Sequence, residues 1–149
     1  MPMKRRHFLH AASAAVLPSV APAVEASSLR VIDTHTHFYD PTRPQGVPWP
    51  GKGTKLYRKV LPSDWLALAA PHGCRETVVV EASAWVEDNQ WILDLAATEK
   101  SIVGFVGHVD PGADFEGHVR RFAKNPVFRG IRWSSSHLVD ASKKDAVKA

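Results

Sequence analysis

Cysteine is nearly absent from this chain of 149 residues, and other informative features are missing with it. The single cysteine, Cys74, excludes an internal disulfide and most cysteine-based zinc sites. Beyond residue 26 no apolar run is long enough to span a membrane, and no basic stripe with interleaved aromatic residues indicates a nucleic-acid partner. The chain is 44% hydrophobic and 23% charged, which is typical of one soluble globular domain.

The first 26 residues have the features of an export signal. A basic run at residues 4–6 precedes an apolar segment over residues 8–24, and small residues at its end fit a cleavage site. The motif Arg5-Arg-His-Phe-Leu9 resembles the twin-arginine signal of proteins that are exported after folding. We predict a signal peptide over 1–26, a domain over 27–149, and a periplasmic or secreted location. The alternative is a basic amphipathic start without a targeting role.

The segment Val31-Ile-Asp-Thr-His-Thr-His37 is the most informative motif of the chain. An apolar run that ends in Asp-x-His-x-His is typical of a β-strand, in which alternate side chains leave on the same face. Asp33, His35 and His37 share this spacing, so the two imidazoles are expected to reach one divalent metal ion. Asp33 would then orient an imidazole or the backbone beside the metal; otherwise it is a strand-end residue that binds backbone N–H groups.

Apolar runs and amphipathic segments alternate along the rest of the chain. The expected strands cover residues 31–37, 77–82, 102–109 and 128–133, and the expected helices begin near Ser63, near Glu87 and at Phe115. The connections are too long for hairpins, which predicts a parallel sheet covered by helices. The Lys-rich end from Ala141 has the pattern of a weak fourth helix, and we interpret it as a solvated terminus.

A loop rich in proline and glycine follows the first expected strand, over residues 41–53. Such a segment cannot be helical, and its length is unusual for a simple connector. Trp49 and Tyr57 give it large aromatic side chains. Two interpretations stay open: a lid that folds over a site, and a surface excursion with packed aromatic residues.

Charged and aromatic residues stand at or near the ends of the later strands, where parallel α/β sheets bind their ligands. Glu81 must be hydrogen-bonded, paired or metal-bound, because an unpaired buried charge is costly. His108 either contacts the substrate, where it would polarise a carbonyl group, or is a core histidine. Arg132 either grips a carboxylate or pairs with Glu81 or Asp110. Trp85 either walls the pocket or packs on a helix.

Four segments together carry a family resemblance: Asp33–His37, Val80–Asn89, Val103–Asp110 and Phe128–Arg132. In this order they resemble the amidohydrolase-related family, also called amidohydrolase 2. The branch that they match is that of the sugar-lactone and pyrone-dicarboxylate lactonases. The resemblance extends from about Leu29 to Trp133, and its first motif is shared across the amidohydrolase superfamily.

The resemblance implies a (β/α)₈ barrel and a metal-dependent hydrolase. Its metal, zinc or manganese, would lie on His35 and His37, although some members of this branch work without a metal. An activated water would attack the carbonyl of a lactone or ester of a sugar-acid-like or dicarboxylate substrate. Glu81, His108 and Arg132 are the candidate substrate-binding residues, and Glu81 and His108 depart from the glutamine and the aromatic residue that are frequent there. The family's later histidines and its proton-handling aspartate have no counterpart here, so the general base is not among these residues.

Four β/α units are half of a (β/α)₈ barrel, which takes about 250 residues. We therefore expect the N-terminal half of such a barrel, from a truncated gene product or a fragmentary reading frame. The uncovered edges of a half-barrel predict self-association. A small-molecule substrate is expected, with neither nucleic acid nor a membrane span. Two alternatives stay open: a catalytically inactive remnant, and a TatD-type metal-dependent phosphoesterase, against which the export signal and the segment 85–89 argue.

Overall fold

The computed structural model describes residues 29–112, 114–135 and 139. The elements follow in the order β1 (Val31–Thr36), α1 (Pro62–Ala69), the 3₁₀ turn η1 (Ala70–His72), β2 (Cys74–Val80), α2 (Asp88–Thr98), β3 (Ile102–Gly107), α3 (Phe115–Ala123) and β4 (Phe128–Ile131). The predicted alternation of strands and helices is thus confirmed. The predicted signal peptide and the segment from Ala141 lie outside the described residues. Within the described part, no helix has both the length and the hydropathy of a membrane span.

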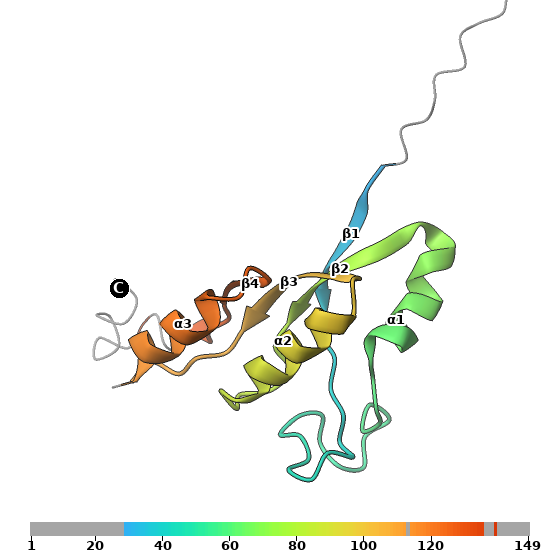
Figure 1. The fold of residues 1–149 in the computed structure, drawn as a ribbon. Coiled ribbons are helices and arrows are strands. Elements are labelled where there is room, and N and C mark those ends of the chain that lie inside the picture. Colours follow the sequence, from blue (N-terminus) through green and yellow to red (C-terminus); the bar gives the residue numbers. More distant parts are fainter. Residues whose placement is uncertain (1–28, 113, 136–138, 140–149) are drawn as a thin grey trace, which may run out of the picture.

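The four strands form one parallel sheet in the order β1-β2-β3-β4. The three α-helices lie along the same side of this sheet, and the strands run side by side behind them (Figure 1). This α/β arrangement is that of part of a (β/α)₈ barrel, in which helices cover the outer face of a closed parallel sheet. The predicted fold class is therefore confirmed for the described residues.

The core lies between the sheet and the helices, because the strands present large apolar side chains to that side. Val79 and Phe105 are 0% and 1% exposed. On the opposite face of the sheet, the valines that alternate with them, Val78 and Val106, are only half-buried. The buried core cluster consists of Phe38, Val79, Ile92, Leu93, Ala96, Ile102, Phe105, Val109 and Phe122.

The ends of the elements follow from local chemistry. Gly73 ends η1 with a φ of 81°, a left-handed backbone that glycine adopts without strain. The strands end one or two residues earlier than the sequence indicated, at Thr36, Val80, Gly107 and Ile131. Apolar residues continue past these ends into the loops, which explains why the hydrophobic pattern overestimated the strands.

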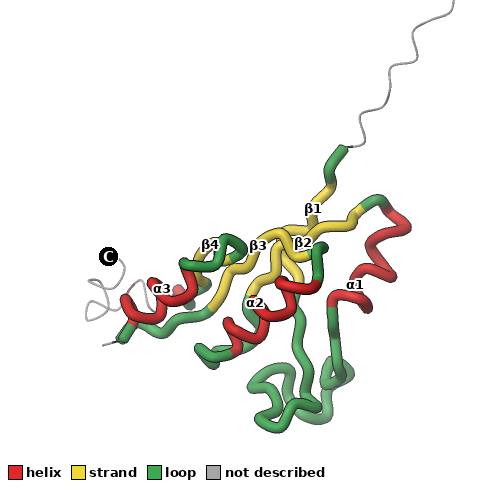
Figure 2. The backbone as a smooth tube through the Cα atoms, viewed as in Figure 1, coloured by secondary structure: helices red, strands yellow, loops and turns green. Residues whose placement is uncertain are grey.

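A long loop joins β1 to α1, and it lies beyond the carboxyl end of β1 (Figure 2). The base of this loop is closed by an antiparallel bridge between Tyr39 and Val60. We name the enclosed segment, residues 40–59, the 40–59 loop. It contains the proline- and glycine-rich stretch of the sequence, and within it the ring of Trp49 packs against that of His37.

Candidate functional site

One position recurs at the carboxyl end of every strand. His37, Glu81, His108 and Arg132 are the first residues after β1, β2, β3 and β4. Parallel strands end at the same edge of a sheet, so these four side chains meet in one cleft of about 700 Å³. The cleft is lined by His37, Trp49, Glu81, Ala82, Ala84, His108, Arg132, Trp133, Ser134 and Ser135.

The two histidines of the first motif lie next to each other. The centres of their rings are 5.0 Å apart and the rings meet edge to face, at 76°. His37 lines the cleft, whereas His35 is exposed and lies outside the lining. Between Asp33 and Thr36 the pairing of β1 with β2 shifts by one residue, an irregularity of the kind that re-aims side chains beside sites.

His37 is held in one orientation by the backbone of β2. Its Nδ1 donates to the carbonyl oxygen of Val80 at 2.9 Å, because a carbonyl can only accept. The other ring nitrogen, Nε2, is then left with a free lone pair. Burial lowers the pKa of His37, the Val80 carbonyl opposes this, and the nearby charges of His35 and Arg132 lower the pKa further. The neutral imidazole, which is the metal-binding form, is therefore favoured.

Asp33 supports the backbone beside these rings. Its Oδ1 accepts a hydrogen bond from the backbone N–H of His35 at 3.1 Å. Its Oδ2 accepts from the indole Nε1 of Trp65 on α1 at 3.1 Å. Asp33 thus binds a backbone N–H, as the strand-end interpretation expects, and the same bond would orient the backbone if a metal were bound beside it. The carboxylate thereby ties the His35 segment to α1.

Glu81 and Arg132 bring opposite charges to the cleft. Burial raises the pKa of Glu81, and the positive charges of His108 and Arg132 oppose this rise, together with the backbone N–H of Ser83. Arg132 is exposed, and its charge acts on both His37 and Glu81. Among the described residues, Arg132 forms no ion pair within 4.0 Å with Glu81 or Asp110. The alternative of a structural ion pair with these carboxylates is therefore not what the structure has.

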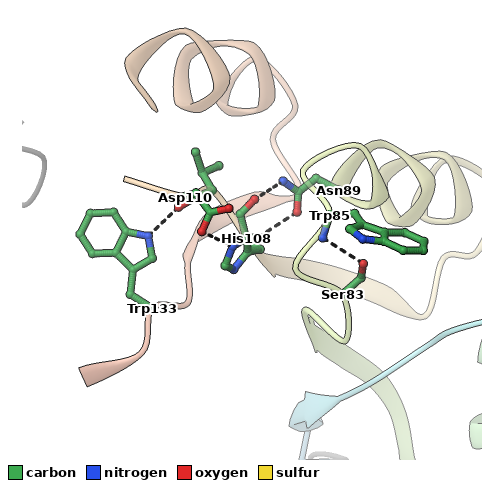
Figure 3. A network of polar contacts seen from close by, with 7 residues as sticks. Ser83, Trp85, Asn89, His108, Asp110 and Trp133 are labelled. Carbon is green, nitrogen blue, oxygen red and sulfur yellow. Dashed lines mark hydrogen bonds and ion pairs between the residues drawn. The ribbon is translucent and has the colours of Figure 1, made fainter. Parts of the chain in front are cut away.

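His108 is fixed through both its backbone and its ring (Figure 3). The side chain of Asn89 on α2 donates from Nδ2 to the His108 carbonyl at 2.6 Å and accepts from the His108 N–H at 2.9 Å. The ring Nε2 of His108 lies 3.0 Å from Oδ1 of Asp110. His108 is 9% exposed, yet it lines the cleft. It is thus both a satisfied, largely buried residue and a wall of the site.

Aromatic side chains close two sides of the cleft. The Trp49 ring lies 5.8 Å from that of His37, and Trp133 donates its Nε1 to the carbonyl of Val109 at 2.6 Å. Trp85 is 40% exposed and is not among the lining residues. Of the two aromatic candidates, Trp49 therefore reaches the cleft and Trp85 does not.

Comparisons with known proteins show which proteins this chain is similar to. The L-fucono-1,5-lactonase of Burkholderia ambifaria is 34% identical over 111 residues, which are 73% of this chain and 38% of that protein. Two crystal structures of an amidohydrolase from Burkholderia multivorans, one with bound HEPES and one with bound zinc, match with TM-scores of 0.61 and 0.59. Each is 26% identical and aligns over 81% of this chain and 42% of the other. No family model matches the chain.

Over the matched part, these relatives support an amidohydrolase-related, lactonase-like family for this chain. The chain spans about two fifths of the length of these relatives. The resemblance inferred from the four sequence segments is confirmed over that part.

The zinc in one of the relatives makes it worth testing whether the residues of this chain fit a metal. Two imidazoles that share a tetrahedral zinc, with Zn–N near 2.0–2.1 Å, have ring centres roughly 5 Å apart. The 5.0 Å between His35 and His37 fits this, as does the hydrogen bond that leaves Nε2 of His37 free. The described residues contain no cluster of three or more His, Cys, Asp or Glu that could hold a metal ion. The distance between the two rings is thus compatible with two positions of a zinc site, and the described residues do not complete such a site.

Two features of the site have no signal in the sequence. The pattern places Asn89 only near the start of the second expected helix, and it assigns no role to Ser134 or Ser135. Asn89 binds backbone groups, which leave no trace in the residue pattern of β3. Trp49 belongs to the loop for which a lid over a site was one of two open interpretations, and its place in the cleft lining favours that one.

Proposed function

We propose that this chain is a hydrolase that opens the lactone ring of a sugar acid. The observation that carries the proposal is the cleft itself. The first residue after each of the four strands lines it: His37, Glu81, His108 and Arg132. The similarity to an L-fucono-1,5-lactonase supports a six-membered sugar lactone as the substrate class. A dicarboxylate lactone is the variant of this proposal that Arg132 would favour.

The reaction adds one water to the lactone carbonyl and breaks the ring C–O bond. The product is an open-chain hydroxy acid, whose carboxyl group then releases a proton at neutral pH. Arg132 is placed to bind the oxygen that gains negative charge and then the product carboxylate, because its guanidinium presents several donors. Glu81 accepts hydrogen bonds from the sugar hydroxyl groups, and His108 contacts the carbonyl end. We assign the general base to no residue of this set.

We further propose that His35 and His37 hold a divalent metal, zinc or manganese. When bound, such an ion polarises a carbonyl and lowers the pKa of a coordinated water. His37 contributes a neutral imidazole with a fixed tautomer, and Asp33 holds the backbone of His35 in place. Because two protein ligands are fewer than a usual zinc site has, the affinity of this pair alone is expected to be modest.

We also propose that the sheet is completed by a second copy of the chain. Strand β1 and strand β4 are the edges of the sheet, and Val78 and Val106 are half-buried on the face away from the helices. Four parallel strands from each copy would give the eight strands of a barrel. Light scattering of the purified chain tests this: a mass of two chains supports it, and a monomer at all concentrations contradicts it.

The export signal remains part of the proposal. Residues 1–26 would direct the folded protein out of the cytoplasm through the twin-arginine route. Replacement of Arg5 and Arg6 by lysine is expected to retain the protein in the cytoplasm. Fractionation of cells that express each form measures this, and export of both forms alike would contradict it.

The activity is tested with L-fucono-1,5-lactone and D-glucono-1,5-lactone, by following the released acid with a pH indicator above the spontaneous rate. The full chain is assayed with added zinc or manganese, beside a His35→Ala, His37→Ala double variant. We expect turnover that the metal increases and the double variant lacks. Equal activity in both proteins would remove the metal role. Hydrolysis of a phosphodiester but of no lactone would favour the phosphoesterase alternative. Hydrolysis of neither substrate would favour the inactive remnant.

A further inference from the structure

The 40–59 loop is fastened to the body of the protein at more than its base. Tyr39 and Val60 exchange two backbone hydrogen bonds of 3.0 and 2.9 Å, and the Tyr39 hydroxyl donates to the Leu56 carbonyl at 3.2 Å. A further attachment lies near the start of the loop, where Arg43 contacts α2. A loop that is attached near both its ends can hold a side chain at a fixed place, which a loop without such contacts cannot.

Arg43 makes the strongest of these attachments. Its two terminal nitrogens donate to the two oxygens of Asp88 at 3.0 Å each, a bidentate pair. Both side chains are only 11% exposed, and the guanidinium lies 4.4 Å from the ring centre of Trp91. Asp88 is the first residue of α2, where the helix dipole also favours a carboxylate. If the pair separated, a buried charge would lose its partner, which is costly, so the contact resists opening.

Trp49 is what this attachment places at the cleft. Its ring meets those of His37 and Tyr39 edge to face, at centre distances of 5.8 and 5.3 Å. Trp49 remains 42% exposed although it packs against both rings. Because it also lines the cleft, part of its indole is available to a ligand there. The polar groups of the cleft come from His37, Glu81, His108 and Arg132. Its two large apolar surfaces are the rings of Trp49 and Trp133.

We propose that Trp49 determines specificity by packing its indole against the apolar face of the lactone ring, and that Arg43 is the positioning residue that holds it there. The inference rests on the proposed lactonase function for the nature of the ligand. A sugar lactone has one face of C–H groups and a rim of hydroxyl groups. An aromatic wall for that face and polar groups for that rim are the two kinds of contact that such a ligand needs.

The attachment is tested first, by limited trypsin digestion of the full chain. Lys52 and Lys55 are exposed in the 40–59 loop, and cleavage after each is followed by mass spectrometry. We expect Arg43→Gln to accelerate these cleavages at least about tenfold, because a buried ion pair is lost. The matched control is Arg120→Gln, which breaks an ion pair with Glu116 that is exposed and lies within α3. Equal cleavage rates in the two variants would overturn the positioning role.

The role of Trp49 is tested by steady-state kinetics on L-fucono-1,5-lactone. We expect Trp49→Ala to raise KM about five- to tenfold, the loss of one aromatic contact, with kcat changed far less. Trp49→Phe should restore most of the affinity, and Arg43→Gln should raise KM in the same direction. Trp85→Ala, which removes an equally exposed indole outside the cleft, should leave both constants unchanged.

The possible failures are distinct. An active wild type whose KM does not respond to Trp49→Ala refutes the specificity role and leaves the lactonase function standing. A wild type that hydrolyses no lactone refutes the proposed function, and with it the assignment of a sugar ring to Trp49; the digestion then decides the role of Arg43 alone. A fall of kcat without a change of KM would also overturn the inference, since it would place Trp49 in the chemical step rather than in binding.

Discussion

Replacement of Asn89 by alanine should destabilise the protein far more than its position on a helix suggests. Asn89 is 2% exposed, and its amide satisfies both the N–H and the C=O of His108, just past the end of β3. Alanine leaves both backbone groups buried without these partners. Each such group costs about 1–3 kcal/mol, so the free energy of unfolding should fall by about 2–6 kcal/mol. This is a large part of the roughly 5–15 kcal/mol that stabilises a typical domain.

The assay is urea unfolding of the full chain, with Asn125→Ala as the matched control. Asn125 also binds a backbone N–H through its side chain, that of Val127 at 2.9 Å, but within one half-exposed turn. Its replacement should cost about 1 kcal/mol or less. Hydrogen exchange supplies a local readout if Asn89→Ala lowers stability too far for a full curve. The amide of His108 should lose protection, whereas that of Phe105, bonded to Val127, should retain more.

Equal costs for the two asparagine variants would refute the reasoning, because the burial of the bonded groups is what distinguishes them. The prediction also bears on the site. His108 is a wall of the cleft, and Asn89 sets the position of its backbone. A variant that folds should therefore bind a lactone less tightly even though no cleft-lining side chain has been replaced.

Three further predictions follow from single contacts. Gly107→Ala should lower the free energy of unfolding by about 1–3 kcal/mol in urea titrations, because a β-carbon there would lie 2.5 Å from Oδ1 of Asn89. The Thr42 hydroxyl, 2.6 Å from Asp40, is the main cause that lowers the pKa of that carboxyl below 3.8; Thr42→Val should raise it in an NMR titration. The stability that Asp40 contributes is present above pH 3.8 and is lost as the pH falls through the lowered pKa. Trp65→Phe removes a bond to Asp33 and should weaken zinc binding by about tenfold in calorimetry.

The order of the elements could be predicted because each strand carries a run of apolar residues and each helix a repeat of 3.6. Val79 and Phe105 show why: fully buried positions tolerate few residue types, so they leave a pattern. The four cleft residues could be placed by a single rule, that ligands meet the carboxyl ends of parallel strands. The rule needs only the approximate ends of the strands. The predicted ends were one or two residues too late, and Glu81, His108 and Arg132 nevertheless line the cleft.

The contacts that hold the site could not be predicted in the same way. Asn89 acts on backbone groups, and backbone groups are the same at every position of the sequence. Arg43 lies 45 residues from its partner Asp88, with α1, η1 and β2 between them, and no sequence period relates the two. The irregular pairing of β1 beside His35 depends on how β1 is seated on β2 and has no signature in the motif. The sequence therefore predicted which side chains line the cleft, but not what positions them.

The proposed metal and the proposed second copy are linked by the number of ligands that a metal needs. A tetrahedral zinc takes four ligands, and the end of β1 would supply two of them, His35 and His37. In a two-fold barrel, β4 of one copy would pair in parallel with β1 of the other, so both copies would present their histidine pairs at the same end. If the pairs share one ion, zinc binds the dimer more tightly than the monomer, and by linkage it must favour dimerisation. Zinc that binds without changing the dimer equilibrium would show that each pair acts alone.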